Sequence, residues 1–261
     1  MRQGRHVVAN GVRLHYVRFG QGRAPLVLLP GITSPAATWE FVAQALASRN
    51  DVYVIDIRGR GLSQGGAELG YRLDDYAADA AGLIQALGLA APAVLGHSMG
   101  ARIAVRLAAR YPDMVGKLVL ADPPVSGPGR RPYPIPLSFY LESLDTVARG
   151  LGYEEMKKGL PWSEEKLDLR MEWLPTCDRH AIIESYRSFH EEDIHGNLGD
   201  IAAPTLLLYA QRGGTVSDEE AVELSSAIGR CDMKRIDDAG HMIPWDQLDA
   251  FVEAVQGFVG G

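Results

Sequence analysis

Short apolar runs alternate with amphipathic segments along most of the chain. The apolar runs predict buried strands at Leu26–Leu29, Val52–Ile57, Ala93–Leu95, Lys117–Ala121, Thr205–Tyr209 and Met233–Ile236. The segments between them have a helical pattern near Trp39–Arg49, Leu73–Leu87, Met99–Arg110, Asp218–Ile228 and Asp246–Phe258. Near-continuous apolar strands that alternate with helices are typical of a mostly parallel sheet covered on both faces. The pattern therefore predicts an α/β fold.

The first twenty residues have a different pattern. Residues 6–9 and 12–17 alternate between apolar and polar side chains on either side of Asn10-Gly11. An Asn-Gly pair between two alternating runs is a strong signal for a β-hairpin. We expect these two strands to form an antiparallel edge of the main sheet.

The alternation of strands and helices stops between about Pro123 and Ile201. This stretch is first rich in proline and glycine and then helical, with no obvious strand. It interrupts the sheet just past the carboxyl end of one strand, where ligands bind in open α/β folds. We expect a core domain formed by residues 1–122 and 202–261, with residues 123–201 as a helical lid over a site.

Composition narrows the possible partners. The formal net charge is −7, from 26 basic and 33 acidic residues, and there is no basic run. The sequence therefore predicts no basic surface for binding nucleic acid or an anionic membrane, although a few arginines could still bind a small anion. Cys177 and Cys231 fit no disulfide or metal spacing and are expected to be free thiols. With no apolar leader or membrane-length run, we expect a soluble cytoplasmic protein.

The segment Gly96-His97-Ser98-Met99-Gly100 lies between a predicted strand and a predicted helix. In this setting Gly-x-Ser-x-Gly forms a tight, strained turn that exposes the serine hydroxyl over the sheet edge. The amides at the start of the following helix would then face a developing oxyanion. Ser98 is the candidate nucleophile, and the amide of Met99 is a candidate oxyanion donor.

A serine nucleophile needs a base and an orienting acid, and in this context the chain order is serine, acid, histidine. His241 lies in a turn after the last predicted strand, between Gly240 and Pro244, and is the candidate base. We favour Asp122, directly after the strand Leu118–Ala121, as the acid. Asp218 has the pattern of a helix N-terminus and Asp56 that of a turn, but both stay open as alternatives.

The remaining candidates concern binding. Gly31 allows a sharp turn that would expose the amide of Ile32 as the second oxyanion donor. Arg130 and Arg131, between prolines and glycines, could bind a substrate carboxylate, or could simply face solvent. Arg102, one turn into the helix after Ser98, is a third candidate, although we favour a salt bridge on the helix surface for it. The segment 190–195 is rich in potential ligands but lacks a metal-binding spacing, so we predict no metal site.

Taken with Pro30-Gly31 and the segment from Asp56 to Ser63, these motifs resemble the α/β-hydrolase family over essentially the whole chain. Many members carry the acid after the strand equivalent to Thr205–Tyr209. This chain has Gln211-Arg212-Gly213-Gly214 there, which favours a displaced acid at Asp122. The resemblance implies a serine hydrolase that needs no metal or organic cofactor.

A closer resemblance lies in residues 30–35, 122–134 and 239–246, which are similar to formyl-amide hydrolases of nicotinate degradation within this family. It implies a small anionic substrate with an N-formyl amide, and a triad of Ser98, Asp122 and His241. An enol-lactonase, a carboxylesterase or a related succinate-type amide hydrolase would share these catalytic residues. A ligand-sensing receptor of the same fold is the alternative from a different class.

Overall fold

The computed structural model describes residues 2–151, 154, 157 and 162–260. Within them, an eight-stranded sheet has the order β1-β2-β4-β3-β5-β6-β7-β8. The strands are β1 (Arg2–Ala9), β2 (Val12–Phe19), β3 (Pro25–Leu29), β4 (Asp51–Ile55), β5 (Ala93–His97), β6 (Lys117–Ala121), β7 (Thr205–Ala210) and β8 (Cys231–Ile236). From β4 to β8 all neighbouring strands are parallel, as the apolar pattern predicts.

The N-terminal hairpin forms the antiparallel edge that was predicted. Asn10 and Gly11 both have positive φ, 51° and 74°, the conformation that a two-residue hairpin turn requires. β2 then pairs antiparallel with β4, with Phe19 opposite Val52. The hairpin thereby extends the sheet on the side away from β8.

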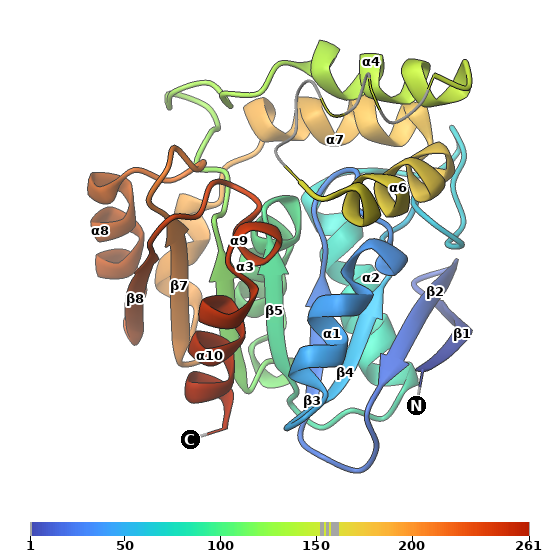
Figure 1. Ribbon diagram of the computed structural model, residues 1–261. Helices are drawn as coiled ribbons and strands as arrows, with labels where there is room; N and C mark the ends of the chain where they lie inside the picture. Colours follow the sequence, from blue (N-terminus) through green and yellow to red (C-terminus); the bar gives the residue numbers. More distant parts are fainter. Residues whose placement is uncertain (1, 152–153, 155–156, 158–161, 261) are drawn as a thin grey trace.

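Helices cover both faces of the sheet (Figure 1). They are α1 (Glu40–Leu46), α2 (Leu73–Ala86), α3 (Met99–Arg110), α4 (Leu137–Ala148), α6 (Glu164–Trp173), α7 (Arg179–Glu191), α8 (Asp218–Ala227), α9 (Ile243–Asp246) and α10 (Leu248–Val259). Short 3-10 turns lie at Ala36–Trp39, Pro112–Met114, Leu174–Thr176 and His195–Asp200. The observed elements lie within a few residues of the predicted ones.

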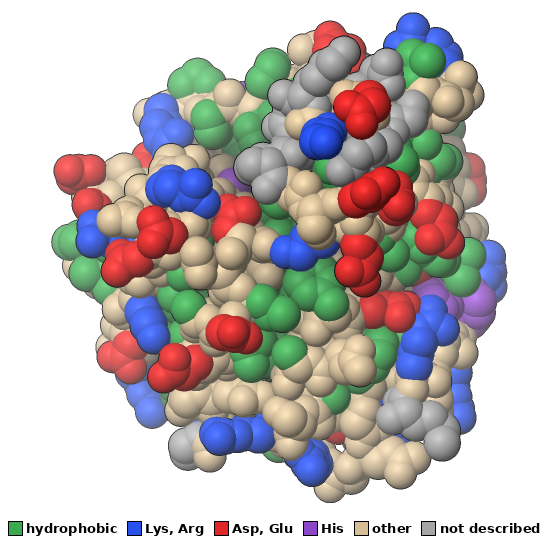
Figure 2. Space-filling view, viewed as in Figure 1, with side chains coloured by type: hydrophobic (Ala, Val, Ile, Leu, Met, Phe, Trp, Pro, Cys, Tyr) green, Lys and Arg blue, Asp and Glu red, His purple; other side chains and the backbone are tan. Residues whose placement is uncertain are grey.

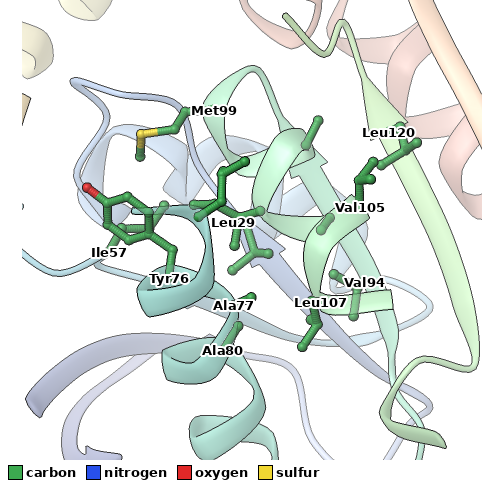
Figure 3. Packing of buried hydrophobic residues seen from close by; sticks show 14 of the residues in the cluster. Leu29, Ile57, Tyr76, Ala77, Ala80, Val94, Met99, Val105, Leu107 and Leu120 are labelled. Carbon is green, nitrogen blue, oxygen red and sulfur yellow. The ribbon is translucent and has the colours of Figure 1, made fainter. Parts of the chain in front are cut away.

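Two apolar cores hold the layers together. Val94 packs with the cluster under α2 and α3, whereas the next residue, Leu95, packs with the cluster under α1 and α10. Alternate side chains of one strand thus fill opposite cores, which explains its continuous apolar run. Figure 3 shows the first cluster, where Tyr76 of α2 and Met99 of α3 lie close to Leu29 of β3.

Residues 123–201, called the insertion below, supply α4, α6 and α7 and no strand among their described residues. In Figure 1 these helices lie above the carboxyl edge of the parallel strands. On the face seen in Figure 2, acidic and basic side chains are interspersed rather than gathered by sign. Among the helices that the structure describes, none is long and apolar enough to span a bilayer.

Arg102 of α3 ties the insertion to the core, contrary to the expected helix-surface salt bridge. It is completely buried, and its guanidinium donates to the backbone carbonyls of Pro124 (2.8 Å), Ser126 (2.7 Å) and Glu192 (2.6 Å). Burial lowers the pKa of Arg102 to about 10. The two ends of the insertion therefore meet at one side chain, where carbonyls take the place of the expected carboxylate.

Candidate active site

The turn between β5 and α3 presents Ser98. Its backbone has φ 54° and ψ −121°, a strained combination for a residue with a side chain. A β-carbon on Gly96 would collide with the carbonyl of Gly100, and one on Gly100 would collide with the carbonyl of Leu29. Both glycines are therefore needed for the strand and the helix to pass this closely.

Ser98, His241 and Asp122 come together from three loops at the carboxyl edge of the sheet. The hydroxyl of Ser98 lies 3.0 Å from His241 Nε2, and His241 Nδ1 lies 2.6 Å from Asp122 Oδ2. A carboxylate beside Nδ1 keeps the proton of a neutral imidazole on that nitrogen, so Nε2 is free to accept the serine proton. This geometry is that of a nucleophile, a base and an orienting acid.

The carboxylate of Asp122 is completely buried at the end of β6. The backbone amide of Thr215 donates to its Oδ2 at 2.7 Å, and the Thr215 hydroxyl donates to the Asp122 carbonyl at 2.7 Å. Oδ1 has no hydrogen-bond partner among the described residues and lies against Gly214. The absence of a side chain at residue 214, in the loop after β7, leaves the space that this carboxylate occupies.

The two alternative acids lie elsewhere. Asp218 starts α8 behind the cap Ser217, and its carboxylate is 3.8 Å from Arg235. Asp56 accepts a hydrogen bond from the amide of Ala36 at 2.6 Å and lies 2.6 Å from His15 Nδ1. Neither contacts His241 in the described part of the chain.

His97 holds the backbone of His241, the candidate base. Its Nε2–H donates to the carbonyl of His241 at 2.8 Å, and the two ring centroids are 5.0 Å apart. Burial, assisted by the nearby His241, lowers the pKa of His97 from 6.5 to about 3. The ring therefore stays neutral in the range where the site could work, and serves as a hydrogen-bond donor beside the triad.

Ile32 and Met99 lie at the two turns beside Ser98, and their role as oxyanion donors stays a prediction. Met99 is the first residue of α3, so its amide is among those without an acceptor inside the helix. Ile32 follows Gly31, which packs against Ser98. The buried Arg60 holds this loop from behind, since its Nε donates to the carbonyl of Ile32 at 2.9 Å.

A cavity of about 300 Å³ opens above Ser98 and His241. The residues that line it come from the loop after β3, the loop before α9 and the insertion: Gly31, Ile32, Thr33, Ser34, His97, Ser98, Ile135, Phe139, Tyr140, Trp162, Arg170, Arg212, Gly240, His241, Met242 and Asp246. The lining is largely apolar, with arginine and hydroxyl groups at a few points. It can therefore enclose a small molecule that has both apolar and anionic parts.

Arg130 and Arg131 do not line this cavity, contrary to the expectation that they bind substrate. Arg130 Nη1 lies 3.0 Å from Glu223, and Arg131 Nη2 lies 2.7 Å from Glu220. Both glutamates belong to α8. The arginine pair thus fastens the start of the insertion to the core, and its charge is already neutralised.

Sequence reasoning missed three contributors to the site. Thr215 holds the acid, and Arg170 of α6 reaches the cavity from the insertion. The third is Tyr133, a buried residue whose hydroxyl pairs at 2.8 Å with that of Tyr140 in the cavity lining. Burial raises the pKa of Tyr133 well above 10, which keeps its hydroxyl protonated.

The described residues contain no cluster of three or more His, Cys, Asp or Glu side chains arranged to hold a metal ion. In the segment 190–195, His195 Nδ1 lies 3.0 Å from Asp193, which also accepts from nearby backbone amides. Cys177 and Cys231 are both free thiols, as predicted. Serine, histidine, aspartate, arginine and tyrosine side chains are among those that line the cavity.

Residues 24–150 match the family described as the alpha/beta hydrolase fold. The parallel sheet, the strained serine turn and the full-length relatives agree, and the chain belongs to the alpha/beta hydrolase family. It is 47% identical over 257 residues to the N-formylmaleamate deformylase of Pseudomonas putida, an alignment that covers 98% of this chain and 96% of that one.

Two solved structures of hydrolases are similar to this chain over almost its whole length. A crystal structure of a serine-to-alanine variant of the N-formylmaleamic acid deformylase from Pseudomonas putida S16 superimposes with a TM-score of 0.93. It is 44% identical and covers 97% of this chain and 100% of that one. The crystal structure of E-2-(acetamidomethylene)succinate hydrolase has a TM-score of 0.82 at 25% identity, with full coverage of both chains.

Proposed function

We propose that this protein hydrolyses the formyl amide bond of N-formylmaleamate, releasing formate and maleamate. The observation that carries the proposal is the 47% identity to N-formylmaleamate deformylase over 98% of the chain. The site supports the same chemistry, because His241 lies within hydrogen-bond distance of Ser98 on one side and of Asp122 on the other, as acyl transfer needs.

In the first half of the reaction, Ser98 Oγ attacks the formyl carbon while His241 Nε2 takes the serine proton. The amides of Ile32 and Met99 hold the oxyanion, each such donor contributing about 3 kcal/mol of transition-state stabilisation. When the tetrahedral intermediate collapses, the C–N bond breaks and His241 gives its proton to the departing nitrogen. Maleamate leaves, and Ser98 carries a formyl ester.

In the second half, His241 takes a proton from a water molecule that attacks the formyl ester. Collapse of this second intermediate returns the proton to Ser98 and releases formate. Asp122 stays ionised throughout, orienting the imidazole and stabilising its protonated form. The His97 ring donates to the backbone carbonyl of His241, and the Thr215 amide donates to the carboxylate of Asp122, so both partners keep their positions.

The direct test is formate release from N-formylmaleamate by the purified protein, compared with the Ser98→Ala variant. We expect many turnovers from the native protein and none from the variant, with the variant's circular dichroism and urea unfolding unchanged. Equal formate release from the two proteins would refute the role of Ser98. Fewer than one product molecule per protein chain from this compound and from acetamide, ester and lactone substrates alike would instead support a ligand-sensing receptor.

A second candidate is hydrolysis of an acetamide of the 2-(acetamidomethylene)succinate type, favoured by the structural similarity to that hydrolase. The two activities differ in the acid they release. Formate from the formyl compound supports the first proposal, and acetate from 2-(acetamidomethylene)succinate supports the second. Turnover of simple esters or lactones alone would retain the serine mechanism and exclude both amide substrates.

A further inference from the structure

Arg170 is a buried cation that lines the candidate active-site cavity from α6. The residue is 7% exposed, and the burial lowers its pKa. Its single hydrogen bond to another described residue is a long one, from Nη2 to the Thr33 hydroxyl at 3.4 Å. Its Nε has no partner in the part of the chain that the structure describes.

Other buried arginines of the molecule are much better satisfied. Arg58 lies against the carboxylate of Asp79, with Nε 2.6 Å from Oδ2. Arg60 and Arg102 each donate several hydrogen bonds to carbonyls or hydroxyls. Arg170 differs because no carboxylate among the described residues lies within 4 Å of its guanidinium. A buried charge without a partner is costly, so an anion that bound there would recover part of that cost.

The second arginine of the cavity does not offer such a site. The Arg212 side chain is 57% exposed, and its Nη2 lies 3.7 Å from Asp246 and donates to the carbonyl of Asp238 at 2.6 Å. Asp246 also lines the cavity and offsets this positive charge. The uncompensated positive charge of the described lining therefore belongs to Arg170.

We propose that Arg170 binds a carboxylate of the substrate and thereby selects small anionic amides. A guanidinium can take both oxygens of a carboxylate in a fork, the geometry that arginine favours. Arg170 already contacts Thr33, the residue next to the expected oxyanion donor Ile32. A short substrate held by its carboxylate would thus place its acyl group near Ser98. The proposal rests on the proposed function for the identity of the substrate that carries this carboxylate.

The experiment compares an anionic and a neutral substrate in three variants. Arg170→Gln removes the charge, Arg170→Lys keeps it without the planar fork, and Arg179→Gln is the matched control. Arg179 is also in the insertion, but its side chain is 51% exposed and pairs with Asp145. The anionic substrate is N-formylmaleamate, and the neutral one is 4-nitrophenyl formate.

For Arg170→Gln we expect kcat/KM for N-formylmaleamate to fall about 10- to 100-fold, mainly through KM, as for a lost charge-assisted hydrogen-bond pair. Hydrolysis of 4-nitrophenyl formate should stay within about threefold of the native value. Arg170→Lys should recover part of the loss, and Arg179→Gln should change neither substrate. Equal losses on both substrates in Arg170→Gln, or no loss on either, would overturn the proposal.

Calorimetric binding of maleamate to Ser98→Ala, with and without Arg170→Gln, separates this proposal from the proposed function. It needs no turnover, so it remains decisive even if native protein releases no formate. We expect measurable binding of maleamate to Ser98→Ala. Adding Arg170→Gln to that variant should weaken the binding at least tenfold. Absent or equal binding to the two proteins would refute the role of Arg170, whatever the activity assay gives.

Discussion

Gly214 leaves the space that the carboxylate of Asp122, the proposed acid, occupies, and Gly214→Ala tests whether that space matters. An ideal β-carbon at residue 214 would lie 2.6 Å from Asp122 Oδ2 and closer still to Oδ1. The carboxylate cannot move aside easily, because Asp122 is completely buried and its amide donates to the carbonyl of Leu208 at 2.8 Å. The backbone of Gly214 has no positive φ in this structure, so alanine meets a collision rather than a forbidden conformation.

The magnitude follows from the displacement. Carbon and oxygen atoms that are not bonded rarely approach within 3.0 Å, so the carboxylate or the loop must shift by about 0.5 to 1 Å. A misplacement of about 1 Å costs roughly 100-fold in rate, and complete loss of the aspartate's orienting role about 10,000-fold. We therefore expect kcat to fall by about 10² to 10⁴, or about 3 to 5 kcal/mol. Overpacking should also lower the free energy of unfolding by about 1 to 3 kcal/mol.

The assay measures formate release at a saturating concentration of N-formylmaleamate, which gives kcat. Urea unfolding establishes that the variant is folded. Gly199→Ala is the matched control, because a β-carbon there meets no atom within 4 Å. In an Asp122→Asn background, Gly214→Ala should cost little further activity, since both changes act on the same hydrogen bond to His241. Near-native kcat in Gly214→Ala, or fully additive losses in the double variant, would refute the reasoning.

Three further outcomes are expected. Asp122→Asn should lower kcat by about 10⁴ while Asp218→Asn leaves it within a few-fold, and the reverse would move the acid to α8. His97 has a pKa of about 3 when folded and about 6.5 when unfolded, so the unfolded chain binds the extra proton between these values. The free energy of unfolding should therefore fall by about 1.4 kcal/mol per pH unit as the pH drops below 6.5. Urea unfolding of His97→Asn at a series of pH values should lack this slope. Arg102→Met should lower the free energy of unfolding by about 3 kcal/mol or more, because buried carbonyls at both ends of the insertion lose their donor.

The fold could be predicted because its signals are local. The Asn10-Gly11 turn, the continuous apolar runs and the serine turn each depend on a few neighbouring residues. The positions of Ser98, Asp122 and His241 at strand ends follow from that order, since parallel strands bring their carboxyl ends to one edge.

The contacts of the arginines could not be predicted in this way. Arg130 and Arg131 pair with glutamates 93 and 89 residues away, and nothing near them in the sequence identifies these partners. The same limit applies to Arg102, whose carbonyl acceptors lie 22 to 90 residues away. Arg170 was missed because its helix has mostly polar residues, and burial of one side chain within it depends on the packing of the insertion.

The carbonyl cluster around Arg102 also restricts how the cavity can admit a substrate. Residues 124–126 and residue 192 share one buried guanidinium, so moving either end away from α3 would leave that charge and several carbonyls unpaired. Both ends of the insertion are thus fixed to α3, and α7, which ends at Glu191, is held at the same place. Admitting a ligand by swinging the whole insertion away from α3 is therefore costly. The insertion residues that line the cavity, Phe139, Tyr140 and Arg170, are thus carried by a segment whose two ends are fixed to the core.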